Sequence, residues 1–203
     1  MKKFIVKANK YLDQDVDGYY NCDYVGYQKK GNPDFINKLK NMSRAHGEMD
    51  LARDYVKVAT VFTKDLTKLI ESLDLKGCMV CLIPRSKAEN NYHRSQKLFK
   101  KALSGVVDSL NAVDGTNAIK RVKDTKTTHN WRLENNNGDA PYVGITVDTC
   151  QINKSAIEGK NIILVDDIYT HGTYIAEDCL QTLFDLGAKS VILYVVAKTR
   201  GDE

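Results

Sequence analysis

The sequence lacks any apolar run long enough to cross a bilayer, and its longest strongly apolar stretch, Val191–Ala197, has the length of a strand. It also lacks a signal-peptide pattern, because the basic start is followed by only three apolar residues, Phe4–Val6. The five cysteines are odd in number and scattered, which is unsuited to a disulfide framework and typical of reduced thiols in the cytoplasm. There is no internal repeat and no low-complexity tract. These absences predict a cytoplasmic globular protein and argue against membrane, secreted, fibrous and disordered classes.

A strong excess of charge of one sign is absent as well. Thirty Lys and Arg residues against 26 Asp and Glu residues leave a net charge of +4. Such a mild bias favours anionic ligands without requiring nucleic acid. The chain has 203 residues, 42% of them hydrophobic, which is enough for one domain with elaborations and a sizeable core.

The N-terminal part of the chain, residues 1–75, is predicted to form a hood or helical region. Its first 45 residues mix tyrosines and polar residues with turn signals, which indicates short strands and loops before a helix that starts near Asn32 or Asp34. Between Asp50 and Leu75, apolar residues recur every three or four positions, as expected of an amphipathic helix.

Residues 76–203 show the alternation of strands and helices that predicts an α/β core with a mostly parallel sheet. A polar segment, residues 120–141, interrupts the pattern and has little to bury, so we expect a long mobile loop with few ordered contacts. The expected strands are residues 78–83, 142–147, 161–165 and 191–197, and the expected helices are a long one through residues 98–110 and a second from about Gly172 to Leu186, where Gly187 ends it.

Two adjacent carboxylates, Asp166 and Asp167, follow the apolar residues 161–165, and a short turn with Thr170 and Gly172 then opens a helix. Ligands bind at the carboxyl ends of strands in open α/β sheets, and the amides at a helix N-terminus suit a phosphate. Paired carboxylates can accept hydrogen bonds from a ribose diol and help to hold a divalent cation. The order of these features predicts a sugar-phosphate site, while the alternative is a solvated turn that only caps a helix.

The stretch 166–174, which reads DDIYTHGTY, resembles the binding motif for phosphoribosyl pyrophosphate (PRPP) of type I phosphoribosyltransferases, usually D-D-x-x-T-T-G-x-T. Within this superfamily the chain is most similar to the ComF competence-protein family, through residues 83–86, 93–98 and 120–125. The family's cysteine-rich zinc module is absent, because only Cys22 lies in the N-terminal region. The resemblance implies a parallel sheet flanked by helices, an N-terminal hood and a long flexible loop.

The resemblance also assigns roles to residues of this chain. Asp166 and Asp167 would contact the ribose hydroxyls and hold Mg²⁺, partly through PRPP and water. Arg85 and Arg121 would stabilise charge on the departing pyrophosphate. The turn that would hold the 5′-phosphate comprises Thr170, His171, Gly172, Thr173 and Tyr174, and the further residues near the pyrophosphate are Ser86, Lys87, Arg94 and Lys123. His171 and Tyr174 replace two threonines of the usual motif, which removes two short hydroxyl donors.

Several other signals favour ordinary structural roles. Cys78 and Cys81 form a C-x-x-C within an expected strand, where their thiols point to opposite faces and are better read as core residues than as zinc ligands. The histidines His46, His93 and His129 share no ligand spacing. Trp131 could stack on a base from the loop or satisfy a local apolar contact.

Three hypotheses remain open at this point. The first is a Mg²⁺-dependent transferase that moves phosphoribose from PRPP to a nitrogen nucleophile and releases pyrophosphate. The second, motivated by the altered turn, is a regulatory or defence module that binds PRPP or a nucleotide without chemistry. The third is nucleic-acid binding through the lysine-rich loop. No motif identifies the acceptor, and a homodimer is expected only because dimers are common in the superfamily.

Overall fold

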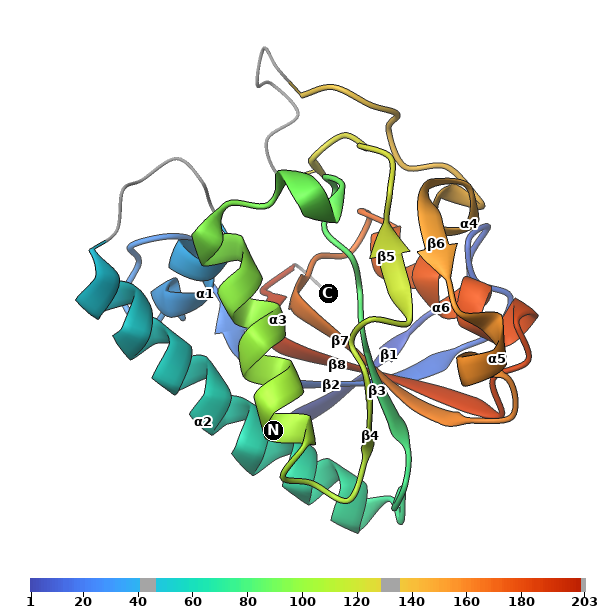
Figure 1. Cartoon of the computed structure of the whole chain (residues 1–203), viewed down its shortest axis with the longest axis horizontal. Coiled ribbons are helices and arrows are strands. Elements are labelled where there is room, and N and C mark those ends of the chain that lie inside the picture. The colour runs from blue at the N-terminus through green and yellow to red at the C-terminus, as the bar shows by residue number, and fades with distance from the viewer. Residues whose placement is uncertain (41–46, 129–135, 202–203) are drawn as a thin grey trace.

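The computed structural model describes residues 1–40, 47–128 and 136–201, and Figure 1 shows their arrangement as a sheet between two groups of helices. His46, His129 and Trp131 lie outside the described residues. The helices are α1 (Asp34–Lys40), α2 (Glu48–Ser72), the 3₁₀ turn η1 (Glu89–Asn91), α3 (Arg94–Val107), α4 (Ile145–Thr149), α5 (Lys154–Ile157) and α6 (Ile175–Asp185). The strands are β1 (Lys2–Val6), β2 (Val16–Tyr24), β3 (Met79–Leu82), β4 (Val113–Gly115), β5 (Ile119–Arg121), β6 (Cys150–Ile152), β7 (Asn161–Tyr169) and β8 (Ser190–Thr199).

The central sheet has six strands in the order β1-β2-β8-β7-β3-β4, and all neighbouring pairs are parallel except β1 and β2. The N-terminal strands therefore extend the same sheet that carries the later strands, through pairing of β2 with β8. A separate antiparallel ribbon is formed by β5 and β6. The expected mixed α/β architecture with a mostly parallel sheet is confirmed. In the described part of the chain, no helix is both long and apolar enough to cross a bilayer.

Side chains of the buried strands alternate between two apolar clusters, one on each face of the sheet. In β7, Ile163 and Val165 belong to the cluster beneath α1, α2 and α3, whereas Ile162 and Leu164 belong to the cluster beneath α5 and α6. This alternation is the period of two expected of a strand. Because β7 is buried on both faces, its residues 162–165 form a continuous apolar run. Figure 1 shows the two groups of helices on opposite sides of the sheet.

The C-x-x-C pair follows the same alternation. Cys78 lies in the cluster beneath α3, and Cys81 lies in the opposite cluster. Burial raises the pKa of Cys78 to about 11 and that of Cys81 to about 12. The prediction that these thiols point to opposite faces as core residues is confirmed.

The strand order contains a point where the connections diverge. From β3 the chain crosses through α3 to β4 at one edge, and from β7 it crosses through α6 to β8 in the other direction. The two helices lie on opposite faces, because α3 packs in one apolar cluster and α6 in the other. In open α/β sheets, ligands bind outside the carboxyl ends of the strands at such a switch point. The fold therefore directs attention to the carboxyl ends of β3 and β7.

The prediction of a strand at residues 142–147 is wrong, because this segment forms the short helix α4. Gly144 precedes the helix with a φ of 93°, which is the left-handed conformation that glycine adopts readily. The carboxylate of Asp178 in α6 accepts hydrogen bonds from the amides of Gly144 and Thr146 at 2.5 and 2.8 Å. A tertiary contact thus overrides the local preference of β-branched residues for a strand.

The polar segment 120–141 also differs from its prediction in the parts that the structure describes. Its beginning pairs in the β5–β6 ribbon, and Thr125 forms an isolated bridge with Asp139. Both Arg121 and Thr125 are buried. The prediction of few ordered contacts is wrong for residues 120–128, because their polar side chains and main-chain groups bond to Thr149, to residues 136–139 and to the loop after β3.

Candidate functional site

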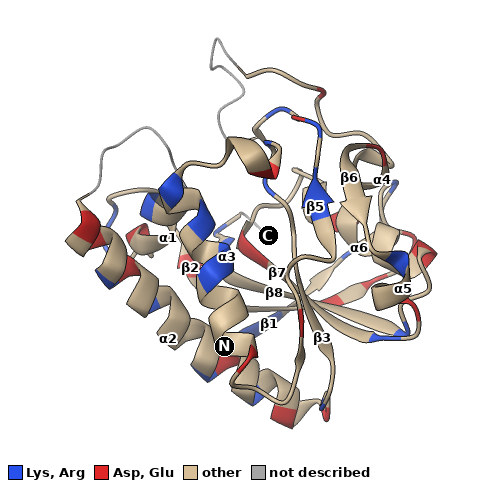
Figure 2. Cartoon of the chain, viewed as in Figure 1, with Lys and Arg blue, Asp and Glu red and all other residues tan. Residues whose placement is uncertain are grey.

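A cleft of about 450 Å³, open to solvent, lies at the carboxyl ends of β3 and β7. Its wall continues through the first half of α3, the end of β4 and the β5 strand. Apolar side chains such as Leu82, Ile83 and Phe99 form part of the lining, and uncharged polar and charged side chains complete it. Figure 2 shows how basic and acidic residues are distributed along the elements of the fold. The cleft therefore occupies the switch point that the strand order identifies.

The two carboxylates reach the cleft because β3 is shorter than its neighbour. Pairing between β3 and β7 ends at Val165, whose carbonyl accepts the amide of Ile83 at 2.9 Å. The strand β7 continues to Tyr169 alongside β8, so it is longer than the predicted strand 161–165. Asp166 and Asp167 thus lie beyond the end of β3, and both line the cleft.

Arg85 contacts both Asp167 of the acidic pair and helix α1, which covers one face of the sheet. Its Nη1 lies 3.7 Å from Oδ2 of Asp167, and its Nη2 donates to the carbonyl of Leu39 at 3.2 Å. Asp167 is buried, and the side chain of Arg85 is only 18% exposed, so the pair is shielded from most solvent screening. This arrangement fixes a cation beside the carboxylates at the edge of the cleft.

Arg121 supplies a second cation to the same cleft and is 2% exposed. Its Nε donates to the carbonyl of Arg85 at 2.6 Å, and its Nη1 donates to Oγ1 of Thr149. Both acceptors are neutral, and no carboxylate among the described residues lies within ion-pair distance of the guanidinium. Because a buried charge is costly unless an opposite charge is near, this side chain favours an anion in the cleft.

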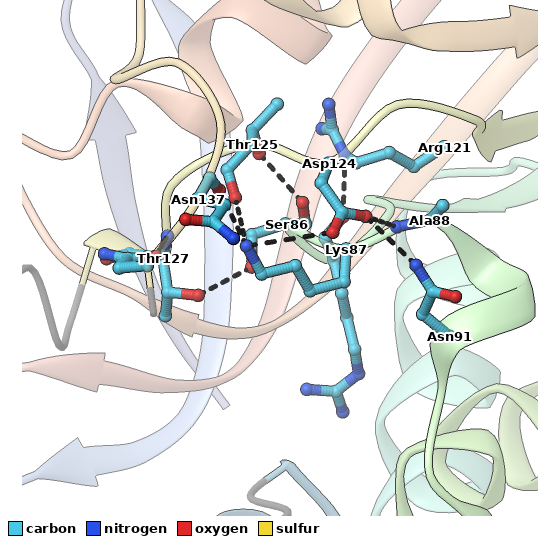
Figure 3. A network of polar contacts seen from close by, with 11 residues as sticks. Ser86, Lys87, Ala88, Asn91, Arg121, Asp124, Thr125, Thr127 and Asn137 are labelled. Atoms are coloured by element: carbon cyan, nitrogen blue, oxygen red, sulfur yellow. Dashed lines mark hydrogen bonds and ion pairs between the residues drawn. The ribbon is translucent and has the colours of Figure 1, made fainter. Parts of the chain in front are cut away.

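Ser86 and Lys87 lie in a polar network outside the cleft lining, shown in Figure 3. Nζ of Lys87 donates to the carbonyls of Thr125 and Asn137 at 3.1 and 2.8 Å, and it lies 4.0 Å from Oδ2 of Asp124. The carbonyl of Ser86 accepts from the amide of Thr125 at 2.6 Å. The network joins the loop after β3 to both described parts of segment 120–141.

The turn that follows β7, residues 170–174, presents main-chain amides at the start of α6. The carbonyl of Thr170 accepts two hydrogen bonds from Thr173, one from its hydroxyl at 2.9 Å and one from its amide at 3.3 Å. The amides of His171, Gly172 and Tyr174 have no hydrogen-bond acceptor among the described residues. Three unused amides next to a helix N-terminus suit an anion, although these residues do not line the cleft.

Tyr174 holds this turn against the N-terminal part of the chain. Its ring stacks on that of Tyr11, with centroids 4.7 Å apart and an interplanar angle of 11°. Tyr174 has a φ of 60°, an uncommon conformation for a residue with a side chain. The hydroxyl of Tyr11 donates to the carbonyl of Pro141 at 3.3 Å. The tyrosine that replaces the motif's last threonine therefore contributes packing.

Beneath the turn lies Glu177, a carboxylate that the sequence analysis did not single out. It is 1% exposed, and its Oε1 accepts the hydroxyl of Tyr169 at 2.9 Å. Its Oε2 is buried without a hydrogen-bond partner in the described part of the chain. Burial raises the pKa of Glu177 above its usual value of 4.5, and the nearby His171 opposes that shift.

We expect Glu177→Gln to become more stable relative to the parent protein as pH rises above 4.5. The raised pKa means that the folded parent binds more protons than the unfolded chain in this range, so its free energy of unfolding falls as pH rises. Gln cannot ionise, and its carbonyl still accepts from Tyr169. The measurement is the difference in Tm between variant and parent from pH 4.5 to about 8. The control is Glu158→Gln, which replaces an exposed carboxylate. If the Tm difference between variant and parent is independent of pH for Glu177→Gln as well as for this control, the expectation is contradicted.

Among the described residues, no group of three or more His, Cys, Asp or Glu side chains could hold a metal ion. The chemistry of the donor set still fits Mg²⁺, which is usually bound by one or two carboxylates together with substrate phosphates and water. Asp166 and Asp167 are the adjacent carboxylates of the cleft lining, whose third carboxylate, Glu89, is paired with Lys100.

The structure brings together four of the residues singled out from the sequence: Asp166, Asp167, Arg85 and Arg121 all line one cleft. Ser86, Lys87, Lys123 and the turn 170–174 do not line it, and Lys123 is exposed. His93 caps α3, as its ordinary reading suggested. Arg94 forms an exposed ion pair with Glu48 at 2.6 Å.

Sequence reasoning missed Tyr92 and Lys100, which also line the cleft. Nζ of Lys100 lies 2.5 Å from Oε1 of Glu89, so this cation is already paired. The signal for Tyr92 is its place in the chain, since the stretch between a β-strand and the following helix borders the ligand site in this class of fold. Lys100 lies within α3 and has no such signal.

A scan against models of protein families finds no match to the chain, and a search of curated proteins finds no relative.

Proposed function

We propose that the chain binds PRPP together with Mg²⁺ and transfers phosphoribose to a nitrogen nucleophile with release of pyrophosphate. In this reaction the anomeric C–O bond to pyrophosphate breaks, and a C–N bond to the acceptor forms. The proposal rests chiefly on one observation: the acidic pair Asp166–Asp167 shares a cleft with Arg85 and Arg121 at the switch point of the sheet.

The acidic side of the cleft supports recognition of a ribose diol. Carboxylate oxygens accept hydrogen bonds from vicinal hydroxyls, and Asp166 and Asp167 are adjacent at the cleft wall. The same carboxylates would hold Mg²⁺, which would neutralise charge that develops on the departing pyrophosphate.

The cationic side supports recognition of the pyrophosphate. Arg121 is buried without a carboxylate partner among the described residues, and the exposed Lys120 lines the cleft beside it. Cations already held in place stabilise a leaving anion without reorganising during the reaction. The turn 170–174, with its unused amides, would take the 5′-phosphate.

A second candidate function, ligand binding without transfer, is favoured by a different observation. Two main-chain amides in the loop after β3 are already occupied: that of Arg85 donates to the Tyr92 hydroxyl at 3.1 Å, and that of Ala88 donates to Asp124 Oδ1 at 2.8 Å. A loop whose amides bond to protein atoms has fewer donors for pyrophosphate. A regulatory or defence module that binds PRPP or a nucleotide accounts for this arrangement.

The two candidates are separated by measuring binding and turnover with the same protein. We expect calorimetry to detect PRPP binding that depends on Mg²⁺, and an assay for pyrophosphate to detect its release with at least one member of a panel of purines, pyrimidines and amines. Binding without release across the panel would favour the second candidate. Absence of PRPP binding at millimolar concentration would overturn the first candidate, and absence of nucleotide binding as well would overturn both. The homodimer and nucleic-acid binding by segment 120–141 remain predictions, tested by sedimentation and by filter binding at rising salt.

A further inference from the structure

We propose that Tyr92 is a binding residue of the cleft, whose hydroxyl donates a hydrogen bond to an oxyanion of the bound diphosphate group. This inference deepens the proposed function and rests on it. It concerns a residue that belongs to no part of the motif 166–174, and it makes the tyrosine a determinant of affinity for the anionic end of the ligand.

The hydroxyl of Tyr92 lies beside the main chain of Arg85, to which the side chain of Arg121 also bonds. Tyr92 directly follows η1, precedes the N-cap of α3 and lines the cleft with a half-buried side chain. Its hydroxyl lies 3.1 Å from the amide nitrogen of Arg85, while the carbonyl of the same Arg85 accepts from Arg121 at 2.6 Å. Burial raises the pKa of Tyr92, and the charges of Arg85 and Arg121 oppose that rise.

The hydrogen-bond geometry leaves the phenolic proton for a ligand. A tyrosine hydroxyl has one proton to donate and can also accept. Here the oxygen accepts the N–H of Arg85, and no atom of the described residues accepts the hydroxyl proton. Burial raises the pKa of Tyr92 above 10.0, so the group is a neutral phenol at neutral pH and keeps the proton.

Charge indicates which ligand group this donor suits. The neighbouring guanidinium of Arg121 has only neutral acceptors among the described residues, so an anion is expected beside it. An O–H that donates to an anionic oxygen makes a shorter and stronger hydrogen bond than one between neutral groups. A diphosphate carries several such oxygens, and a neutral acceptor base would not satisfy Arg121.

The test compares Tyr92→Phe with the parent protein by calorimetric titration with magnesium pyrophosphate and with PRPP. We expect Kd for both ligands to rise about 10-fold to 100-fold, the usual effect of losing a hydrogen bond to a charged group. Tyr142→Phe is the matched control, because it also removes a hydroxyl that donates to a charged oxygen, that of Asp148 at 3.1 Å, outside the cleft. Its Kd should stay within about 2-fold of the parent value.

The direction in which Kd changes in Tyr92→Phe distinguishes a hydroxyl that donates to the ligand from one with a merely structural role. If Tyr92 only occupies the amide of Arg85, its removal frees that amide for the anion, and affinity stays equal or increases. Either result, in a parent protein that does bind, overturns the inference and leaves the proposed function standing. A parent protein that binds neither ligand overturns both the inference and the proposed function.

Should Tyr92→Phe fold poorly, a crystal of the parent protein soaked with magnesium pyrophosphate provides the test. A phosphate oxygen within hydrogen-bond distance of the Tyr92 hydroxyl supports the inference, and a bound diphosphate without that contact overturns it.

Discussion

Simultaneous replacement of Asp166 and Asp167 by Asn is expected to lower PRPP-dependent release of pyrophosphate by at least about 100-fold. Both side chains line the cleft, and Asn keeps their size while removing the charge that binds Mg²⁺ and one of the two oxygens of each carboxylate that can accept from a diol. Loss of the carboxylate opposite Arg85 also frees this cation from the ion pair measured at 3.7 Å. The measurement is pyrophosphate release with an accepted acceptor, accompanied by calorimetry of PRPP binding.

A control with the same change in charge is available in the turn between β1 and β2. Asp13 and Asp15 are exposed and do not line the cleft, so Asp13→Asn with Asp15→Asn should leave release within about 2-fold of the parent rate. Equal activity of the Asp166–Asp167 variant and this control would contradict the proposed function. A loss of Tm specific to the cleft variant would point to the Arg85 ion pair as a structural contact.

The largest effect on stability is expected from Asp178→Ala, with a loss of about 2–4 kcal/mol in the free energy of unfolding. Asp178 is 2% exposed and accepts the amides of both Gly144 and Thr146, so truncation leaves one partly buried and one buried donor without this partner. Urea unfolding measures the loss, and hydrogen exchange should show faster exchange at these two amides than in α6.

The matched control lies on the same helix. Asp185 in α6 is exposed, and Asp185→Ala should change the free energy of unfolding by less than about 0.5 kcal/mol. If Asp178→Ala costs no more than this control, α4 does not depend on the carboxylate, and its helical form would need another cause.

The sequence predicts well those helices and strands whose own pattern of apolar residues matches the face that is buried in the fold. The helix α2 repeats apolar residues with helical spacing, and the structure buries Val58, Phe62 and Leu66 on that face. β8 is likewise a continuous apolar run that lies between two other parallel strands. In both cases local pattern and tertiary environment agree, so the pattern is sufficient.

Predictions fail where a distant residue decides the local structure. The β-branched residues Ile145, Thr146 and Val147 favour a strand, yet the carboxylate of Asp178 fixes the amides at the start of a helix there. Similarly, the hydrophilic sequence around Thr125 gives no sign that its main chain bonds to Ser86 at 2.6 Å. Such contacts span about 30 to 40 residues of sequence, and no local pattern encodes them.

The candidate site likewise contains some features that the sequence predicts and others that depend on tertiary contacts. The adjacent acids and the following glycine turn are visible as a short motif, because they are contiguous in the sequence. The burial of Arg121 and the position of the Tyr92 hydroxyl depend on how the β5–β6 ribbon and the loop after β3 meet, so they required the structure.

The stacking of Tyr174 on Tyr11 has a thermodynamic consequence for any ligand of the turn 170–174. The stack fastens the turn to the segment between β1 and β2, and Tyr11 is in turn bonded to Pro141. A turn held directly by Tyr11, and through it by Pro141, loses little conformational entropy when a phosphate arrives, so more of the interaction energy appears as affinity. The ring of Tyr174, at a position where the motif that this stretch resembles has a threonine, thereby contributes to preorganisation of the turn.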